Sequence, residues 1–239
     1  TVLDITDSKR DEIRKNDFIA MASHELKTPL TSIKAYIQIL AKKLGDTGDS
    51  FINNTLQKAG NQVNKMTDLI HGFLDLSRLE SGKLQLKITA FDINELIRET
   101  VAEINLVNPG HIVNFKPEGV LTVNADSEKI GQVITNLLNN AFKYSDKETP
   151  IVVTGSKTEG NIRVTVADKG IGIKAKDQEK LFQRFYRVEN ERMKNISGFG
   201  IGLYLSSEII QRHKGKIGVE SEEGRGSTFY FTLPAADRT

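Results

Sequence analysis

The stretch Phe18-Ile-Ala-Met-Ala-Ser-His24-Glu-Leu-Lys-Thr-Pro29 lies inside a long run of helical periodicity. Apolar residues recur at intervals of three and four on both sides of it, which is the pattern of a helix that packs along one face. These residues are Ile19, Ala22, Leu26, Leu30, Ile33, Ile37, Leu40 and Leu44. His24 lies about 200° round the helix from Ala22 and therefore faces away from this seam. The stretch predicts a bundle helix over residues 8–44 that exposes a histidine.

The neighbours of His24 favour a chemical role for it. Glu25 can accept a proton from the imidazole or orient it. Thr28 is one turn further along and shares the exposed face. Pro29 offers no N–H to the carbonyl of Glu25, so it predicts a kink just after the histidine. The alternative is an ordinary surface histidine beside a tolerated kink.

A second helix is predicted after the loop of residues 45–50, which supplies glycines and cap-forming side chains. Its apolar residues again step by four and three, at Ile52, Leu56, Ala59, Val63, Met66, Ile70 and Phe73. Two such seams predict an antiparallel helical hairpin. Because two helices alone bury little surface, we expect a four-helix bundle formed by a homodimer.

Composition narrows the class of protein. The 239 residues suffice for two domains, and 33 basic residues against 31 acidic ones give no sign of a nucleic-acid partner. The chain has no cysteine, which excludes disulfides and thiolate chemistry and agrees with a reducing compartment. It contains no signal peptide and no apolar run of about 18 residues. Since it starts without Met, we expect a fragment of a longer protein.

The heptad pattern ends near residue 81, and mixed helix and strand signals follow. Residues 81–87 look like a strand-bearing connector. Helices are predicted at 92–106, 126–144 and 202–213, and strands at 112–116, 120–123, 150–156, 161–167, 216–221 and 227–233. Turns at 159–161 and 223–226 predict hairpins of an antiparallel sheet. Helices on one face of such a sheet make an α+β sandwich.

Polar residues gather on one face of the helix predicted at 126–144. They are Asn136, Asn139, Asn140 and Lys143, and the apolar residues largely cover the other face. Amide oxygens are suitable ligands for Mg²⁺, and a lysine can meet phosphate oxygens. The alternative is a helix face that is simply solvated.

Two glycine-containing stretches also suggest a ligand. Asp168 ends a strand and is followed by Gly170 and Gly172, so the backbone could approach a flat ligand closely. The Asp168 carboxylate could then accept a hydrogen bond from an amino group of that ligand. A strand-ending turn is the alternative. Gly198-Phe-Gly-Ile-Gly202 precedes a helix, whose free N–H groups favour phosphate. Between these stretches Phe182 and Phe185 could anchor a base or belong to the core, and residues 189–197 could order over a nucleotide.

Six sequence boxes thus follow one another along the chain. They are His24-Glu-Leu-Lys-Thr-Pro-Leu30, Asn136-Leu-Leu-Asn-Asn140-Ala-Phe-Lys143-Tyr144-Ser145, Asp168-Lys-Gly-Ile-Gly172, Phe182-Gln-Arg-Phe-Tyr-Arg187, Gly198-Phe-Gly-Ile-Gly202-Leu203 and Gly224-Arg-Gly-Ser-Thr-Phe229. Together they resemble the catalytic core of the bacterial sensor histidine kinases over residues 10–235. The resemblance implies a multi-domain chain in which an all-α helical hairpin of the HisKA type precedes an α+β sandwich of the HATPase (Bergerat) type.

The resemblance also implies domain boundaries. Residues 8–82 would form the dimerisation and phosphotransfer domain, 83–90 a linker and 91–235 the ATP-binding domain. Residues 1–7 resemble the end of a PAS sensor domain, so we expect an upstream sensor. The catalytic core is expected in the cytoplasm, and anchoring of the full-length protein in the inner membrane stays open.

By position, the resemblance implies an ATP-dependent kinase that phosphorylates itself on His24. Glu25 would assist as general base, and the phosphoryl group would pass to the receiver domain of a response regulator. Thr28 would support a reverse phosphatase activity. Asn140 would hold Mg²⁺, and Asp168 would bind the adenine amino group. The other implied residues of the ATP site are Asn136, Lys143, Tyr144, Gly170, Gly172, Ile173, Phe182, Arg187, Gly198, Gly200, Gly202, Leu203 and Thr228.

Two alternatives belong to other functional classes. A gyrase-like or MutL-like ATPase would carry a glutamate as the water-activating base where this chain has Asn136, and an amide cannot act as that base. A non-catalytic scaffold would bind nucleotide or a partner without phosphorylating itself. The intact boxes argue against the scaffold.

Overall fold

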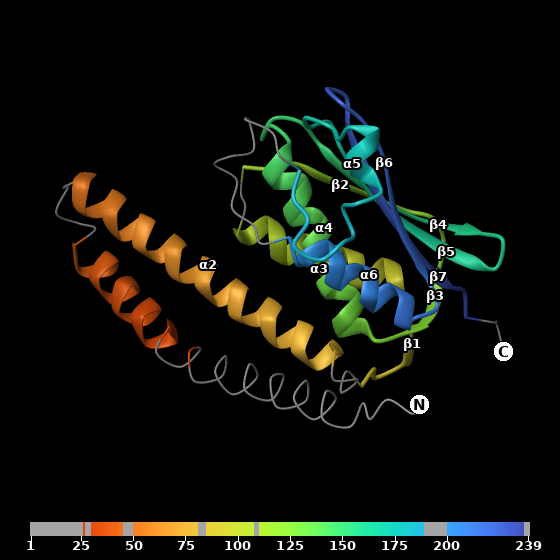
Figure 1. Cartoon of the computed structure of the whole chain (residues 1–239), viewed down its shortest axis with the longest axis horizontal. Coiled ribbons are helices and arrows are strands. Elements are labelled where there is room, and N and C mark those ends of the chain that lie inside the picture. The colour runs from red at the N-terminus through yellow and green to blue at the C-terminus, as the bar shows by residue number, and fades with distance from the viewer. Residues whose placement is uncertain are drawn as a thin grey trace, which may run out of the picture. The chain divides into compact units, whose positions relative to one another are not determined.

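The structure is a computed structural model that describes residues 26, 30–44, 50–80, 85–107, 110–188 and 200–236 (Figure 1). The chain divides into two compact units, Thr1–Leu84 and Gln85–Thr239. Each unit has its own hydrophobic core. A helical unit followed by an α+β unit confirms the predicted fold class.

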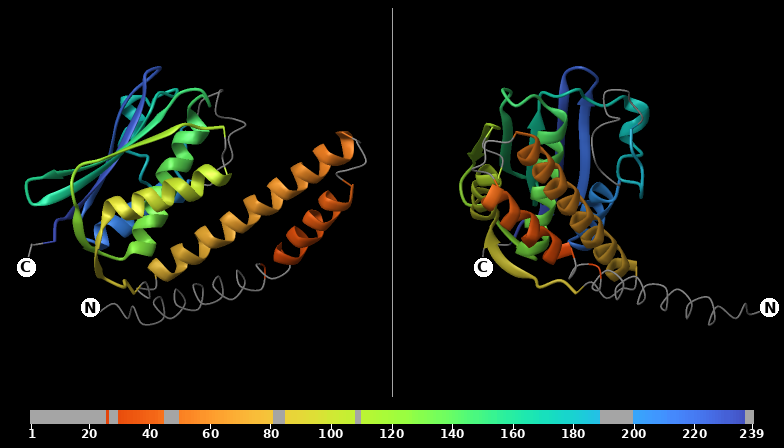
Figure 2. Two further views of the ribbon diagram at one scale, coloured as in Figure 1. Left: turned by 180° about the vertical axis from the view of Figure 1, so that it is seen from behind. Right: turned by 90° about the vertical axis from the view of Figure 1, so that its left-hand side faces the viewer.

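The first unit is a pair of helices, one over residues 30–44 and the other α2 (Ser50–Glu80), which run side by side in both views of Figure 2. Leu30, Val63 and Ile70 are buried between them, and Ile37 packs against this cluster. All four belong to the predicted seams, which confirms the hairpin. The predicted helical residues 8–25 and the PAS-like residues 1–7 lie outside the described residues.

Part of the predicted seam is exposed among the residues that the structure describes. Leu26, Ile33, Leu40 and Met66 are between 42% and 52% exposed. Apolar side chains repeated along a helix pair are the usual mark of a surface that another helix covers. The hairpin therefore buries only part of its apolar surface by itself.

The second unit is built on a five-stranded sheet in the order β2-β4-β5-β7-β6. The strands are β2 (Val113–Pro117), β4 (Ile151–Thr158), β5 (Asn161–Asp168), β6 (Lys216–Glu222) and β7 (Gly226–Pro234). The predicted hairpins at 159–161 and 223–226 are both present, because β4 pairs with β5 and β6 with β7 in antiparallel register. The sheet is nevertheless mixed, since β2 and β4 are parallel. Between them the chain crosses over through α4 (Ser127–Tyr144), which returns it to the same end of the sheet.

A second, two-stranded sheet was not foreseen from the sequence. β1 (Thr89–Asp92) pairs antiparallel with β3 (Thr122–Ala125), which lies two residues later than the predicted strand. Residues 85–88 form no regular element, so the strand that was expected in the connector begins instead at Thr89. A strand of four residues is too short to show a clear alternation.

Three helices cover one face of the large sheet, as Figures 1 and 2 show. They are α3 (Ile93–Val107), α4 and α6 (Gly202–Arg212). Alternate residues of the strands face these helices, so Val164, Val166 and Phe231 are fully buried with Ile134 and Leu137 of α4. The arrangement confirms the predicted α+β sandwich. No helix of the described residues is both long and apolar enough to span a bilayer.

Asp126 holds together the point where the chain enters this unit. Its carboxylate caps α4 by accepting the backbone N–H of Lys129 at 3.1 Å, and it also accepts the backbone N–H of Lys87 at 2.8 Å. Burial raises the pKa of Asp126, but these two N–H groups and nearby cations outweigh that effect and lower it. The Asp126 N–H in turn donates to Nε2 of the buried His213, 3.0 Å away. The connector is thereby fixed to the sandwich at Lys87.

Candidate nucleotide site

Most of the predicted site residues lie in the second unit. His24, Glu25, Thr28 and Gly198 lie outside the described residues, as does the predicted lid of residues 189–197. The remaining residues come from the second half of α4, the end of β5 with the segment after it, the start of α6 and β7. The contacts below show which of them the fold brings together.

The polar face of α4 is half-buried rather than freely solvated. Asn136, Asn139 and Asn140 all have intermediate exposure, and only Lys143 is exposed. The opposite face is buried as predicted, through Val133, Ile134, Leu137, Leu138 and Ala141. Amide groups at the margin of a core can bind a ligand from solvent while their helix is held rigidly.

The start of α6 packs directly on Asn136. The Asn136 side-chain NH₂ donates to the Ser206 hydroxyl, 3.0 Å away, and Ser206 is almost fully buried. A side chain at Gly202 would meet the Asn136 amide and displace it from its present position. The N-terminal N–H groups of α6 therefore lie beside the amides of α4, which is a setting that favours phosphate.

Asp168 is a buried carboxylate at the end of β5. It accepts the backbone N–H of Gly170 at 2.8 Å, and the backbone N–H of Ser227 from β7 also donates to it. Burial raises the pKa of Asp168 above its ordinary value of 3.8, although the two N–H donors oppose the rise. Two oxygens offer about four acceptor positions, so two donors leave capacity for a ligand amino group.

Gly170 and Gly172 are required by the packing of the protein itself. A side chain at Gly170 would overlap the carbonyl of Tyr144, whose oxygen accepts the N–H of Ile171 at 3.2 Å. A side chain at Gly172, where φ is +65°, would overlap the carbonyl of Glu222. The segment after β5 is thus pressed between the end of α4 and the β6–β7 hairpin. Gly170 also links Tyr144 to Asp168 at one place in the fold.

The segment containing Phe182 and Arg187 lies next to the same end of α4. Burial raises the pKa of the Tyr144 phenol, and the charge of Arg187 partly opposes this rise, so the two side chains are near each other. The Phe185 N–H donates to the carbonyl of Gly200 at 3.0 Å. Phe185 itself is 54% exposed, whereas Phe182 packs against the core. Phe182 thus packs with the core, whereas the Phe185 ring is largely exposed.

The remaining predicted residues take simpler positions. Ile173 and Leu203 pack against the hydrophobic core. Thr228 lies on β7 opposite Ala167 and next to Ser227. The structure therefore gathers Tyr144, Gly170, Asp168 and the Thr228 strand into one region, and Asn136 with Gly202 into another.

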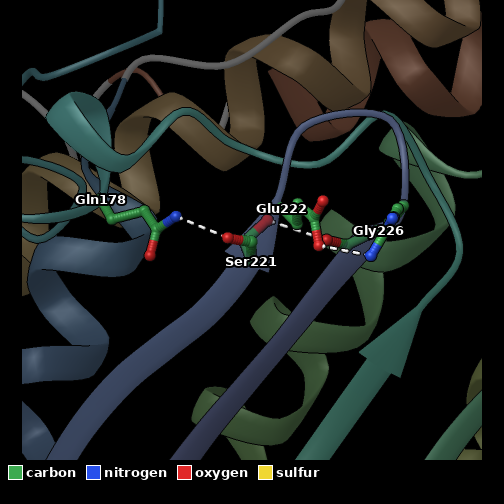
Figure 3. Close-up of polar contacts among 5 residues, drawn as sticks. Gln178, Ser221, Glu222 and Gly226 are labelled. Carbon is green, nitrogen blue, oxygen red and sulfur yellow. Dashed lines mark hydrogen bonds and ion pairs between the residues drawn. The ribbon is translucent and has the colours of Figure 1, made fainter.

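Sequence reasoning missed a set of polar contacts behind this region, drawn in Figure 3. Gln178 belongs to α5 (Ala175–Gln178), a helix that was not predicted because four residues show no periodicity. Its amide reaches Ser221 on β6, which also contacts Gly226 and Ser227 on β7. Gln178 and Ser221 are 43 residues apart along the chain, so no local signal could have revealed their contact.

The donor set fits a nucleotide with a weakly held metal better than a metal centre of the protein. The described residues contain no group of three or more His, Cys, Asp or Glu side chains that could hold a metal ion. Mg²⁺ is often bound through one or two protein oxygens, with phosphate oxygens and water completing its shell. The amide oxygen of Asn140 can supply such a contact.

Two family models match the chain. Residues 14–82 match the His Kinase A (phospho-acceptor) domain. Residues 125–237 match the Histidine kinase-, DNA gyrase B-, and HSP90-like ATPase. The two matches fall on the helical unit and on the sandwich respectively.

Curated relatives include sensor histidine kinases of Bacillus subtilis and Staphylococcus aureus. The sensor histidine kinase WalK of Bacillus subtilis (strain 168) is 32% identical over 237 residues, which is 98% of this chain and 39% of WalK. The sensor protein kinase WalK of Staphylococcus aureus is 31% identical over 97% of this chain and 56% of that protein. The chain thus spans about two fifths to a little over half of these relatives.

Solved structures that resemble this chain are also histidine kinases. The catalytic domain of histidine kinase ThkA is 32% identical, with a TM-score of 0.53, over 62% of this chain and 95% of that domain. Full-length ShkA in complex with AMPPNP gives a TM-score of 0.73 over 93% of this chain and 46% of ShkA, at 23% identity, which shows likeness of fold.

Proposed function

Because the chain belongs to the sensor histidine kinase family, we propose that it is the catalytic core of an ATP-dependent protein-histidine kinase. It would transfer the γ-phosphoryl group of ATP to His24 and then pass it to an aspartate of a response regulator. Since ATP and receiver domains are the proposed substrates, this core would act in the cytoplasm.

The observation that supports this proposal best is the pairing of two polar regions on α4. Asp168 and Gly170 lie against Tyr144 at the end of the helix, and the start of α6 lies against Asn136. Asn136 and Tyr144 are eight residues apart, or about 12 Å along the helix. The Asp168 carboxylate near Tyr144 can accept a hydrogen bond from the amino group of a base. The N–H groups at the start of α6, near Asn136, suit the phosphates of the same nucleotide.

The proposed roles follow the chemistry of each side chain. Asp168 would accept the adenine amino group, and Asn140 would bind Mg²⁺, which would neutralise charge on the phosphates. Lys143 would meet a phosphate oxygen as a point charge. The other residues of the proposed ATP site are Asn136, Tyr144, Gly170, Gly172, Ile173, Phe182, Arg187, Gly198, Gly200, Gly202, Leu203 and Thr228.

The proposed phosphotransfer depends on a neutral imidazole. His24 would attack in line with the leaving group, and Glu25 would accept the imidazole proton. An ordinary histidine has a pKa of about 6.5, so the rate should fall below that pH as the nucleophile becomes protonated. The proposed domain of residues 8–82 carries His24, and the proposed domain of residues 91–235 binds ATP. Residues 83–90 are the proposed linker.

Radiolabelling tests the proposed activity. The protein is incubated with γ-labelled ATP and Mg²⁺, and the labelled product is then treated with acid and with alkali. We expect label that acid removes and alkali does not, which is the behaviour of a phosphohistidine. A protein that binds AMPPNP but takes up no label would instead support the nucleotide-binding scaffold.

We expect the protein to be a dimer through its helical unit. The exposed seam residues Ile33, Leu40 and Met66 would then be buried by the partner's helices. Sedimentation equilibrium should give twice the mass of the 239-residue chain at micromolar concentration. Ile33→Glu should shift the protein towards monomer, whereas the same change at Ile88, an exposed isoleucine of the second unit, should not. A wild-type monomer would contradict the proposed bundle.

Thr28→Ala should separate the two proposed activities. In this family the matching position helps to orient water for dephosphorylation of the regulator, so the variant should keep autophosphorylation within about twofold and lose roughly tenfold or more of the phosphatase rate. The two rates are measured separately, from label on the kinase and from loss of label on a phosphorylated receiver domain. Thr31→Ala, three residues further along, is the control. Equal loss of both rates in Thr28→Ala would refute this division.

A further inference from the structure

The side-chain NH₂ of Gln178 donates hydrogen bonds to two backbone carbonyls. The amide nitrogen lies 2.9 Å from the oxygen of Ile173 and 2.8 Å from the oxygen of Ser221, and Figure 3 shows it pointing at Ser221. Ile173 ends the segment that follows Asp168, and Ser221 belongs to β6. One side chain of α5 therefore bridges the segment after β5 and the β6–β7 hairpin.

The hydroxyl of Ser221 continues this bridge. It accepts the N–H of Ile173 at 2.8 Å, donates to the carbonyl of Gly226 at 2.8 Å and lies 2.9 Å from the hydroxyl of Ser227. One hydrogen donated and two accepted fill the capacity of a serine hydroxyl. Ser221 is thus fully engaged with both sides of the Asp168 region.

Ser227 connects the bridge to the carboxylate. Its backbone N–H donates to Asp168, and Asp168 lies opposite it in the β5–β7 register. The second donor to the carboxylate, the N–H of Gly170, comes from the segment that Gln178 and Ser221 hold at Ile173. The Ser221 hydroxyl thus contacts Ser227 directly and also Ile173, three residues after Gly170. Gln178 supports the same backbone by donating to the carbonyls of Ile173 and Ser221.

We propose that Gln178 and Ser221 are positioning residues that set the selectivity of this site for adenine. Neither side chain touches the Asp168 carboxylate, but both hold the backbone that aims it. The proposal rests on the proposed ATP site. A correctly oriented carboxylate accepts a hydrogen bond from the amino group of adenine and repels the carbonyl oxygen that guanine carries at the same ring position. Loss of this orientation should therefore weaken adenine binding more than guanine binding.

Gln178→Glu is the sharpest variant, because it keeps the shape of the side chain and replaces only the donor NH₂ by oxygen. The new carboxylate would face two carbonyl oxygens with no hydrogen between them. We expect AMPPNP affinity to fall about tenfold or more, while GMPPNP affinity changes less than about threefold. The ratio of the two affinities, measured by calorimetry with Mg²⁺ present, should therefore fall.

Matched variants separate this effect from charge and from general damage. Gln183→Glu introduces the same charge at an exposed side chain five residues away, and its affinity ratio should equal that of the wild type. Ser221→Ala removes the hydroxyl without adding charge and should lower the ratio in the same direction. It also serves as the test variant if Gln178→Glu does not fold. Thermal unfolding of each variant reports its stability independently.

Two other outcomes are distinguishable. An unchanged affinity ratio in both Gln178→Glu and Ser221→Ala, whether the two affinities fall equally or only the stability falls, would show a purely structural role. It would overturn the inference and leave the proposed ATP site intact. A wild type that binds neither nucleotide would overturn the proposed function, and the inference with it.

Discussion

His24→Gln should abolish labelling of the protein by γ-labelled ATP, a loss of at least about a thousandfold. The glutamine side chain is polar and of similar size, but its amide nitrogen is not nucleophilic, so no phosphoryl acceptor remains at this position. Binding of AMPPNP should be unchanged, because the proposed nucleotide site lies in the other unit. The label is measured after denaturing electrophoresis without acid treatment.

His71 provides the matched control for this experiment. It is the other histidine of the helical unit and lies on α2, and His71→Gln should retain labelling. If His24→Gln kept its label and His71→Gln lost it, the acceptor would be on α2 and the assignment of His24 would be wrong. Loss of AMPPNP binding in His24→Gln would show instead that the variant is damaged.

Asp168→Asn should lower AMPPNP affinity by about a hundredfold, the upper range for a buried hydrogen bond to a charged group. The carboxylate accepts N–H groups from Gly170 and Ser227, and an amide replaces one of its oxygens by a donor. Either a backbone N–H loses its acceptor or the new NH₂ faces the amino group of the base. Asp146→Asn, at an exposed turn, is the control and should bind as the wild type does. Calorimetry with Mg²⁺ present measures both.

The acid dependence of binding provides a second test of Asp168. Burial raises its pKa in the folded protein above the ordinary 3.8, so folding gains stability from the protonated form and loses that contribution as the pH rises through the raised pKa. Nucleotide binding has the opposite preference, since it needs the ionised acceptor. Wild-type affinity should therefore fall as the pH drops through the raised pKa. Asp168→Asn should lack this component, and identical acid profiles of the two proteins would contradict the assignment.

The parts of the fold that the sequence could predict are those with a repeating pattern. Leu30, Ile37, Val63 and Ile70 follow helical spacing and form the core of the helical unit. The alternation in β5 and the glycine turn at 159–161 likewise predict a strand and a hairpin that are present. Periodicity works here because each residue of the pattern reports the same buried face.

The parts that could not be predicted depend on contacts between distant residues. The parallel pairing of β2 with β4 results from the path of the chain through α4, and no property of either strand reveals it. Asp168 and Gly170 were identified from a local motif, whereas Gln178 and Ser221, 43 residues apart, have no such motif. A lone glutamine on a four-residue helix looks like any surface residue until its partners are known.

The bond from Lys87 to Asp126 also sets the length of a tether. The helix α2 ends at Glu80, and the sandwich holds the chain again at Lys87, so only seven peptide steps join the two units. Fully extended, these steps reach about 25 Å. Loss of the Asp126 carboxylate would release the chain at Lys87 and would therefore lengthen the covalent connection between the two units.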